Sequence, residues 1–225
     1  YPNGIPFKNF LITDPVRQQY PWREFSITGI KNLGLPVWNP YSFSGTPNLA
    51  NFQSAVFYPF NLLFLILPFQ TSWSFLILAQ PFLAGIFMFL YLRNLKLDNY
   101  SSFFGSITFS FGGFFATWLE WGTVLHTALW LPLVLLSIDK IPKNLEDKKK
   151  LVTWSAILIL GTSASFFAGH LQTFFYFSLL GFFYLLGRIW QNKSKKLILI
   201  FLTTWLLTLS IISIQLIPSL KFILL

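Results

Sequence analysis

Residues 197–217 read LILIFLTTWLLTLSIISIQLI and contain no charged side chain. An α-helix needs about 17–25 predominantly apolar residues to cross a lipid bilayer, so this stretch predicts a membrane-spanning helix. Moving outward along the chain, comparable apolar stretches occupy residues 72–92, 100–118, 122–138, 151–168 and 170–187. The sequence therefore predicts an all-α polytopic membrane protein with about six transmembrane helices.

The composition agrees with a membrane protein. Hydrophobic residues make up 54% of the chain and charged residues only 10%, and the mean hydropathy is +0.60. This leaves too little polar surface to cover a water-soluble protein of 225 residues. The chain contains no cysteine, which excludes disulfides and thiolate metal sites.

The formal net charge of +9 comes mainly from short loops between the apolar stretches. Eleven of the 16 Lys and Arg residues lie in three such loops: Arg93 and Lys96; Lys140, Lys143, Lys148, Lys149 and Lys150; Arg188, Lys193, Lys195 and Lys196. Cytoplasmic loops of membrane proteins carry such an excess of basic residues. The clustering explains the basic charge without a nucleic-acid partner, so we expect none.

The basic loops also predict an orientation for the chain. If they are cytoplasmic, the turns around Glu120 and His170 lie on the outer side of the membrane. Residues 1–53 then form an extracytoplasmic first loop, and residues 71–225 form the transmembrane region. The chain starts at Tyr1 rather than Met and ends inside an apolar stretch, so we expect a fragment.

The apolar stretch at 54–69 decides whether the three basic loops can all lie on one side of the membrane and the turns around Glu120 and His170 on the other. It is short, contains Pro59 and ends at Pro68, so we expect an interfacial juxtamembrane helix at 54–70 rather than a crossing. An ordinary short crossing is the alternative. It would place Arg93 on the wrong side of the membrane.

Asp14 is the first candidate for chemistry in the outer loop. It precedes Pro15, a pattern typical of an N-cap whose side chain accepts a backbone N–H at the start of a short helix. A carboxylate held beside Arg17 and Gln18 at the membrane boundary could also act as a general base or hold a divalent metal. The neighbouring pair Arg23–Glu24 is typical of a solvated charged face.

The second half of the loop, residues 35–53, is rich in turn-forming residues and amides. Four amides are spaced along it: Asn39, Asn48, Asn51 and Gln53. Their side chains could hydrogen-bond sugar hydroxyls, with Trp38 or Tyr41 as a stacking platform. The alternative is an ordered loop that satisfies its own backbone.

Three ionisable side chains lie within or at the ends of the apolar stretches: Glu120, His126 and His170. Such groups are costly at membrane depth and therefore often functional. Because all three lie toward the same predicted side as Asp14, one outward-opening cavity could hold them. The alternative for each histidine is a satisfied structural residue. No zinc-ligand spacing or phosphate-binding glycine loop is present, so we predict no cofactor beyond the divalent metal considered at Asp14.

Four longer strings carry a family resemblance. Residues 14–22 fit D-x-x-x-Q-x-Y-P-W, residues 34–63 read GLPVWNPYSFSGTPNLANFQSAVFYPFNLL, and HTALWLPL and AGHLQTFFY follow at 126–133 and 168–176. With these strings the chain resembles the YfhO family of bacterial membrane proteins over essentially its whole length. That family looks related to the GT-C-fold glycosyltransferases, which take a sugar from a polyprenyl-phosphate carrier on the outer side of the membrane.

The resemblance implies a GT-C-like fold, a reaction and roles for single residues. The partners would be a lipid-linked sugar donor, membrane lipid and a cell-envelope polymer as acceptor, as in the glycosylation of lipoteichoic acid. Asp14 falls at the position of the family's acidic catalytic residue and would deprotonate or orient the acceptor hydroxyl in an inverting transfer. Arg17, His126 or His170 would neutralise the departing lipid phosphate. Gln172, in the last matching string, would join the substrate-binding residues.

Two non-enzymatic functions stay open. A transporter or flippase for a lipid-linked or small polar solute would need polar residues near the membrane midplane and broken helices there. Here the polar groups gather toward the outer end, which favours chemistry at the surface. A scaffold that organises envelope assembly would use the same outer loop to bind a partner.

Overall fold

The computed structural model describes residues 13–32 and 34–224, and these residues are mostly helical. Within this part of the chain, five helical segments are long and apolar enough to span a membrane: α3 (Phe69–Asn94), the consecutive α6 (Val124–Ala128) and α7 (Leu131–Lys143), α8 (Lys148–Phe167), α9 (Leu171–Asn192) and α10 (Lys195–Ile223). They coincide with five of the six expected spans. The chain therefore has the architecture of a multi-pass membrane protein.

The sixth expected span, residues 100–118, is divided into two shorter helices, α4 (Asn99–Ser110) and α5 (Gly113–Trp118). Between them Gly112 has an extended backbone, with φ −61° and ψ 164°. A Cβ at Gly112 would lie 2.7 Å from the Thr108 carbonyl oxygen, so the break leaves no room for a side chain. The prediction of one continuous helix is therefore wrong at this point.

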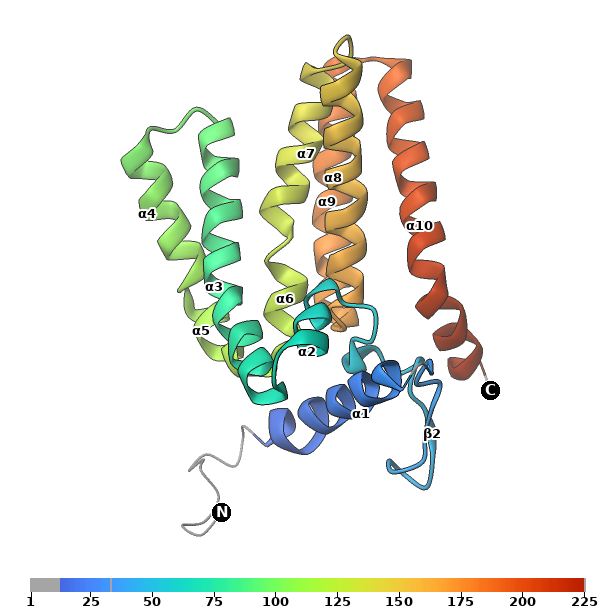
Figure 1. Ribbon diagram of the computed structural model, residues 1–225. Coiled ribbons are helices and arrows are strands. Elements are labelled where there is room, and N and C mark those ends of the chain that lie inside the picture. Colours follow the sequence, from blue (N-terminus) through green and yellow to red (C-terminus); the bar gives the residue numbers. More distant parts are fainter. Residues whose placement is uncertain (1–12, 33, 225) are drawn as a thin grey trace.

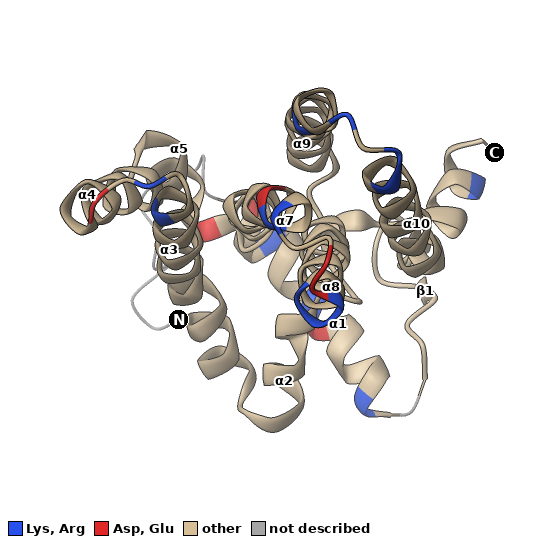
Figure 2. Cartoon of the chain, turned by 90° about the horizontal axis from the view of Figure 1, so that it is seen from above, with Lys and Arg blue, Asp and Glu red and all other residues tan. Residues whose placement is uncertain are grey.

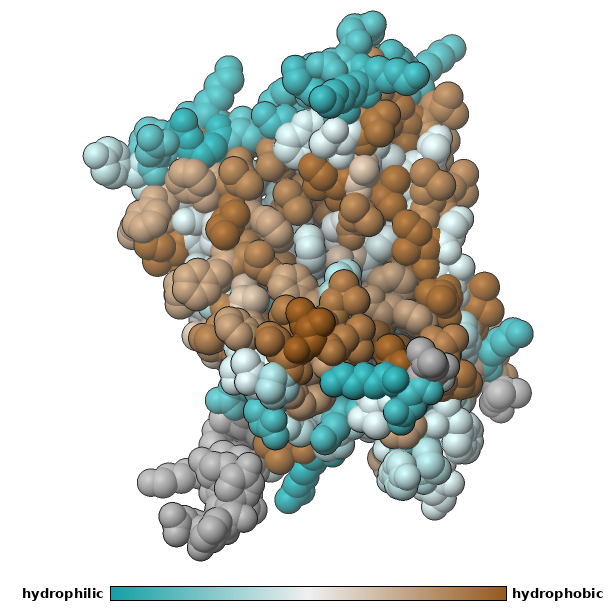
Figure 3. All heavy atoms as spheres, in the orientation of Figure 1, coloured by the Kyte–Doolittle hydropathy of each residue, from teal (hydrophilic) through white to brown (hydrophobic). Residues whose placement is uncertain are grey.

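The long helices run side by side, and their connections alternate between two ends of the molecule (Figure 1). The connections α3–α4, α7–α8 and α9–α10 lie at one end, which we call the basic end because it carries the basic loops at 93–98, 140–150 and 188–196 (Figure 2). The opposite end, which we call the platform end, carries the segments before α3. Hydrophobic side chains form a broad band between the two polar ends (Figure 3). The three basic loops thus share one end, as the orientation argument requires.

The platform end is built mainly from the outer loop. The π-helix η2 (Pro15–Gln19) continues into α1 (Tyr20–Lys31), which lies across the end of the bundle rather than along the long helices (Figure 1). Two short strands, β1 (Trp38–Asn39) and β2 (Thr46–Pro47), pair antiparallel in a small hairpin. The described part of the loop, residues 13–32 and 34–53, is thus folded.

The segment before α3 forms short turns instead of the single juxtamembrane helix expected at 54–70. These turns are the 3-10 helices η3 (Phe52–Ser54) and η4 (Pro59–Leu62) and the single α-helical turn α2 (Leu63–Ile66). Tyr58 has an extended backbone, with φ −68° and ψ 128°, a conformation that a following proline favours, so η4 begins at Pro59 instead of continuing from η3. None of the three turns is long enough to cross a membrane.

A buried apolar cluster joins the platform to the bundle. Its residues come from the outer loop, from the segment before α3 and from three long helices: Ile27, Ala55, Tyr58, Phe64, Leu76, Ala164, Phe166, Phe167, Ala168 and Ile212. Gly169, in the turn between α8 and α9, adds a close backbone contact. Its φ is +97°, and a Cβ there would overlap the Phe52 carbonyl oxygen. The platform is thereby held at one position against the ends of the helices.

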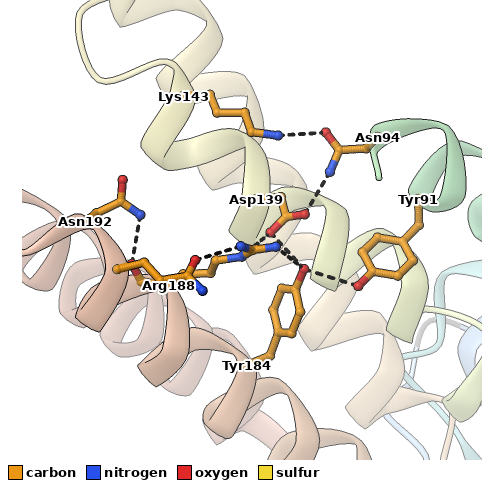
Figure 4. A network of polar contacts seen from close by, with 8 residues as sticks. Tyr91, Asn94, Asp139, Lys143, Tyr184, Arg188 and Asn192 are labelled. Atoms are coloured by element: carbon orange, nitrogen blue, oxygen red, sulfur yellow. Dashed lines mark hydrogen bonds and ion pairs between the residues drawn. The ribbon is translucent and has the colours of Figure 1, made fainter. Parts of the chain in front are cut away.

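A buried carboxylate near the basic end ties three long helices together (Figure 4). Asp139 of α7 is 3% exposed, and its Oδ1 accepts hydrogen bonds from Arg188 Nε at 2.7 Å and from the Tyr184 hydroxyl at 2.9 Å, both on α9. Its Oδ2 accepts from Asn94 Nδ2 of α3 at 2.8 Å. Because each carboxylate oxygen is hydrogen-bonded, the network fixes how α3, α7 and α9 lie relative to one another.

Candidate functional site

Asp14 stands at the start of η2, half-buried at the platform end. Pro15 occupies the first position of η2, but the Asp14 side chain does not cap the helix, so the predicted capping role is wrong. The reason is its helical backbone, with φ −59° and ψ −43°, whereas a capping residue normally has an extended one. The carboxylate instead accepts a hydrogen bond of 3.4 Å from Gln18 Nε2. The carboxylate therefore makes no capping hydrogen bond to the backbone of its own helix.

A second carboxylate lies in the turn next to Asp14. Glu120 belongs to η5 (Leu119–Trp121), and η2 packs against η5. Glu120 and Arg17 are both exposed. The structure thus brings Asp14, Arg17 and Glu120 to one region of the platform end, where their charges face solvent.

Arg23 of α1 is fully buried, whereas a solvated face was expected for Arg23 and Glu24. Its Nη1 donates to Asn61 Oδ1 at 2.5 Å, and its guanidinium lies 6.0 Å from the centre of the Trp73 ring. Its Nε and Nη2 have no hydrogen-bond partner, and none of the ion pairs among the described residues includes it. Burial lowers the pKa of Arg23 to about 10, so it is charged at neutral pH. Only Glu24 is exposed as expected.

His126 acts as a structural residue, which was the alternative considered for it. The ring is fully buried, with Nε2 2.8 Å from the Leu76 carbonyl oxygen and Nδ1 2.6 Å from the Tyr58 hydroxyl. Because a carbonyl oxygen can only accept, Nε2 carries the hydrogen and Nδ1 accepts from Tyr58. Both ring nitrogens are used within the protein, which leaves neither for a substrate.

His170 and Gln172 line a cavity of about 430 Å³ between α5, α6 and α9. Most of its other walls are aromatic or aliphatic, such as Phe115 and Tyr176. His170 caps α9: its Nδ1 accepts from the Thr173 backbone N–H at 3.3 Å and from the Thr173 hydroxyl at 2.7 Å. Nε2 therefore carries the ring hydrogen. Burial lowers the pKa of His170, so the ring is neutral at neutral pH.

Asp14, Glu120 and His126 do not line this cavity. The expectation of a single cavity that holds all four candidates is therefore wrong. The carboxylates lie on the face of the platform, and His170 lies in a space between helices. The two regions are neighbours, because Trp118 lines the cavity and directly precedes η5.

Two of the three asparagines that could bind sugar form hydrogen bonds within the loop. Asn48 is buried, and its Nδ2 donates to Ser26 Oγ and to the Pro36 carbonyl oxygen, both at 3.0 Å. Asn39 is also buried, and its Oδ1 accepts from the Tyr41 backbone N–H at 2.9 Å. These contacts match the alternative of a loop that satisfies its own backbone.

Gln53 and Trp38 also hold the loop together. The Gln53 Oε1 accepts from the buried Gln19 Nε2 at 3.2 Å, which links η3 to η2. Trp38 lies against Gly45, where an added Cβ would be 2.5 Å from the indole ring. One face of Trp38 is therefore covered by its own hairpin and is not open to a sugar ring.

The described residues contain no group of three His, Cys, Asp or Glu side chains that could hold a metal ion. The adjacent turns of Asp14 and Glu120 supply two carboxylates, a number that can hold Mg²⁺ together with water and a substrate phosphate, so the divalent metal considered at Asp14 stays a prediction. Comparison of the chain with protein-family models, with curated proteins and with solved structures gave no match.

Proposed function

We propose that this protein is a membrane glycosyltransferase of the GT-C type, which transfers a sugar from a polyprenyl-phosphate donor to a cell-envelope acceptor at the platform end. The position of Asp14 carries the proposal. It is a half-buried carboxylate, not used as a helix cap, at the end opposite the three basic loops. Because basic loops favour the cytoplasmic side, this end and residues 1–53 would lie outside the cell membrane.

The residue pattern around Asp14 supports the same function. The string D-x-x-x-Q-x-Y-P-W, which resembles the YfhO family, has Asp14 and Gln18 as its two polar members. These are the two side chains that contact each other, at 3.4 Å. A platform of short helices at the outer membrane surface is also what the resemblance implies.

In the proposed reaction Asp14 is the general base. It accepts the proton of an acceptor hydroxyl while the hydroxyl oxygen attacks C1 of the donor sugar. The bond between C1 and the phosphate oxygen breaks with inversion at C1, and the polyprenyl phosphate leaves with the bonding electrons. Gln18 positions the carboxylate through its amide.

Arg17 and His170 are the candidates for stabilising the charge of the departing phosphate. Arg17 is exposed about one turn after Asp14 and can meet an anion at the membrane surface. His170 offers its Nε2–H beside a cavity whose apolar walls suit the hydrocarbon of a lipid carrier. We no longer assign this role to His126, because both of its ring nitrogens are bonded within the protein.

A transporter or flippase fits the described helices less well. The charged side chains of the five candidate spans lie within about one and a half turns of the helix ends, as Arg93, Lys149 and Arg188 do. Solute transport normally places its polar groups near the membrane midplane instead. The breaks in the helices, such as the one at Gly112, carry no charged side chain.

The test is the profile of lipid-linked glycans in cells that carry the full gene, lack it, or carry Asp14→Asn. We expect a polyprenyl-phosphate sugar to accumulate without the gene and with Asp14→Asn, because the donor is made but not consumed. Glu24→Gln removes an exposed carboxylate from the same platform and should give the wild-type profile. Unchanged lipid-linked sugars in cells without the gene would contradict the proposal and favour the scaffold.

A further inference from the structure

A second hollow opens at the platform end, between the β1–β2 hairpin and the end of α10. Its volume is about 360 Å³, and we call it the hairpin pocket. Three aromatic and three neutral polar side chains contribute to its lining: Trp22, Phe43, Phe222, Ser42, Thr46 and Asn51. It lies apart from Asp14, because Trp22 follows Asp14 by eight residues, or roughly 12 Å of helix.

The aromatic side chains of the hairpin pocket come from three separate segments, namely α1, the hairpin turn and α10. Phe43 is 89% exposed, so burial of its ring contributes little to folding. Its backbone has φ +49°, and the following Ser44 has φ +62°, a conformation that non-glycine residues rarely adopt. Such strained residues persist where the surrounding structure holds them, and they cluster at binding sites. The turn therefore presents an aromatic ring to solvent at the edge of the pocket.

The polar side chains of the hairpin pocket retain free donor groups. The Ser42 hydroxyl oxygen accepts from Trp22 Nε1 at 3.3 Å and from Asn39 Nδ2 at 3.2 Å, which leaves its own hydrogen to donate. Asn51 Oδ1 accepts from the Gln53 backbone N–H at 3.1 Å, which leaves the amide N–H groups. No charged side chain is among the described residues that line the pocket.

We propose that the hairpin pocket binds an uncharged saccharide. Aromatic faces beside neutral hydroxyl and amide groups suit a ligand with apolar C–H faces and many hydroxyls. An anionic ligand would find no cation in the lining, and a purely apolar ligand would leave the donor groups of Ser42 and Asn51 without partners. That the saccharide is a unit of the acceptor polymer rests on the proposed function, whereas binding itself does not.

The test is a titration of the full-length protein with the methyl glycosides of glucose, galactose and N-acetylglucosamine, followed by saturation-transfer NMR. The protein is held in lipid nanodiscs, because sugar-headed detergents would compete for the pocket. We expect at least one glycoside to bind, with an affinity that does not change with salt. Phe43→Ala should weaken binding about 2- to 10-fold, the scale of one aromatic contact, and the ring's exposure means that the variant should fold.

Tyr100→Ala is the matched control. Tyr100, on α4 at the basic end, is also a strongly exposed aromatic residue at 89%, and it does not line the hairpin pocket, so this variant should bind as the wild type does. Equal weakening by Tyr100→Ala and Phe43→Ala, or no binding of any glycoside, would overturn the assignment. Tighter binding of glucose 1-phosphate than of methyl glucoside would also overturn it.

Asp14→Asn separates the hairpin pocket from the proposed function. We expect this variant to bind the glycoside normally while it no longer transfers sugar. If the wild type binds the glycoside and transfers nothing, the proposed function fails and the pocket stands. If it transfers sugar without binding any glycoside in this pocket, the pocket fails and the function stands.

Discussion

Arg23 and Asn61 are bonded to each other inside the platform, yet they should respond differently to replacement. Asn61→Leu leaves the buried guanidinium without its partner, and a hydrogen bond to a charged group contributes about 1.5–3 kcal/mol to the free energy of unfolding. Arg23→Met removes the charge together with its desolvation cost, so we expect a change below about 1.5 kcal/mol. Unfolding of both variants in nanodiscs measures the difference. A greater loss in Arg23→Met than in Asn61→Leu would contradict this account of the pair.

His170 should make the stability of the protein depend on pH. Because burial lowers its pKa in the folded state, the unfolded chain binds more protons between that lowered pKa and the ordinary value of about 6.5. The contribution of His170 to the free energy of unfolding is therefore complete above about pH 6.5, and it is lost as the pH falls from this value toward the lowered pKa.

The variant His170→Asn isolates this effect, because asparagine can still cap α9 but does not titrate. The unfolding temperature should fall less between about pH 7.5 and about pH 5.5 in His170→Asn than in the wild type. An equal fall in both proteins would mean that His170 is not the group responsible.

Single residues could be identified from the sequence more easily than their partners. Asp14 before a proline and His126 inside an apolar stretch can both be picked out from the sequence alone. However, Arg23 bonds to Asn61, 38 residues further on, and Tyr58 bonds to His126, 68 residues further on. Such pairs depend on the packing of the whole platform, and no local pattern contains them.

At the scale of elements, the turn between α8 and α9 should be intolerant of a side chain. Gly169→Ala places a Cβ against the Phe52 carbonyl oxygen and forces alanine into a left-handed conformation, which alone costs about 1–2 kcal/mol. Gly181, within α9, has open space at its Cβ position, so Gly181→Ala should stabilise the protein by up to about 1 kcal/mol. The unfolding temperatures of both variants provide the measurement. Equal stability of Gly169→Ala and the wild type would contradict the close contact between this turn and the platform.

Five of the expected spans follow from length and hydropathy, because a helix that crosses lipid must be long and apolar. The division between α4 and α5 does not follow from hydropathy, since the residues around Gly112 are as apolar as those of a continuous helix. The turn η4 begins at Pro59, because the residue before this proline, Tyr58, has an extended backbone. Hydropathy therefore predicts where the chain meets lipid, and local backbone sterics decide where a helix is interrupted.

For the whole molecule, the basic and platform ends should lie on opposite sides of the membrane. The chain contains no cysteine, so single cysteines can be introduced at exposed positions and labelled in intact cells with a membrane-impermeant maleimide. Cysteines at Lys96, Lys149 and Lys193 should be protected, and those at Lys31 and Glu120 should be labelled. Labelling of the cysteines at both Lys96 and Glu120 would mean that α4 and α5 do not cross the membrane.

The most direct measurement is sugar transfer by the full-length protein in vesicles, from a radiolabelled polyprenyl-phosphate sugar to an envelope acceptor. The wild type and Glu24→Gln should transfer at the same rate. Asp14→Asn should be about 10²- to 10⁴-fold slower, the usual contribution of a general base, with an unchanged unfolding temperature. Transfer by Asp14→Asn at the wild-type rate would contradict the role of Asp14 as the catalytic base.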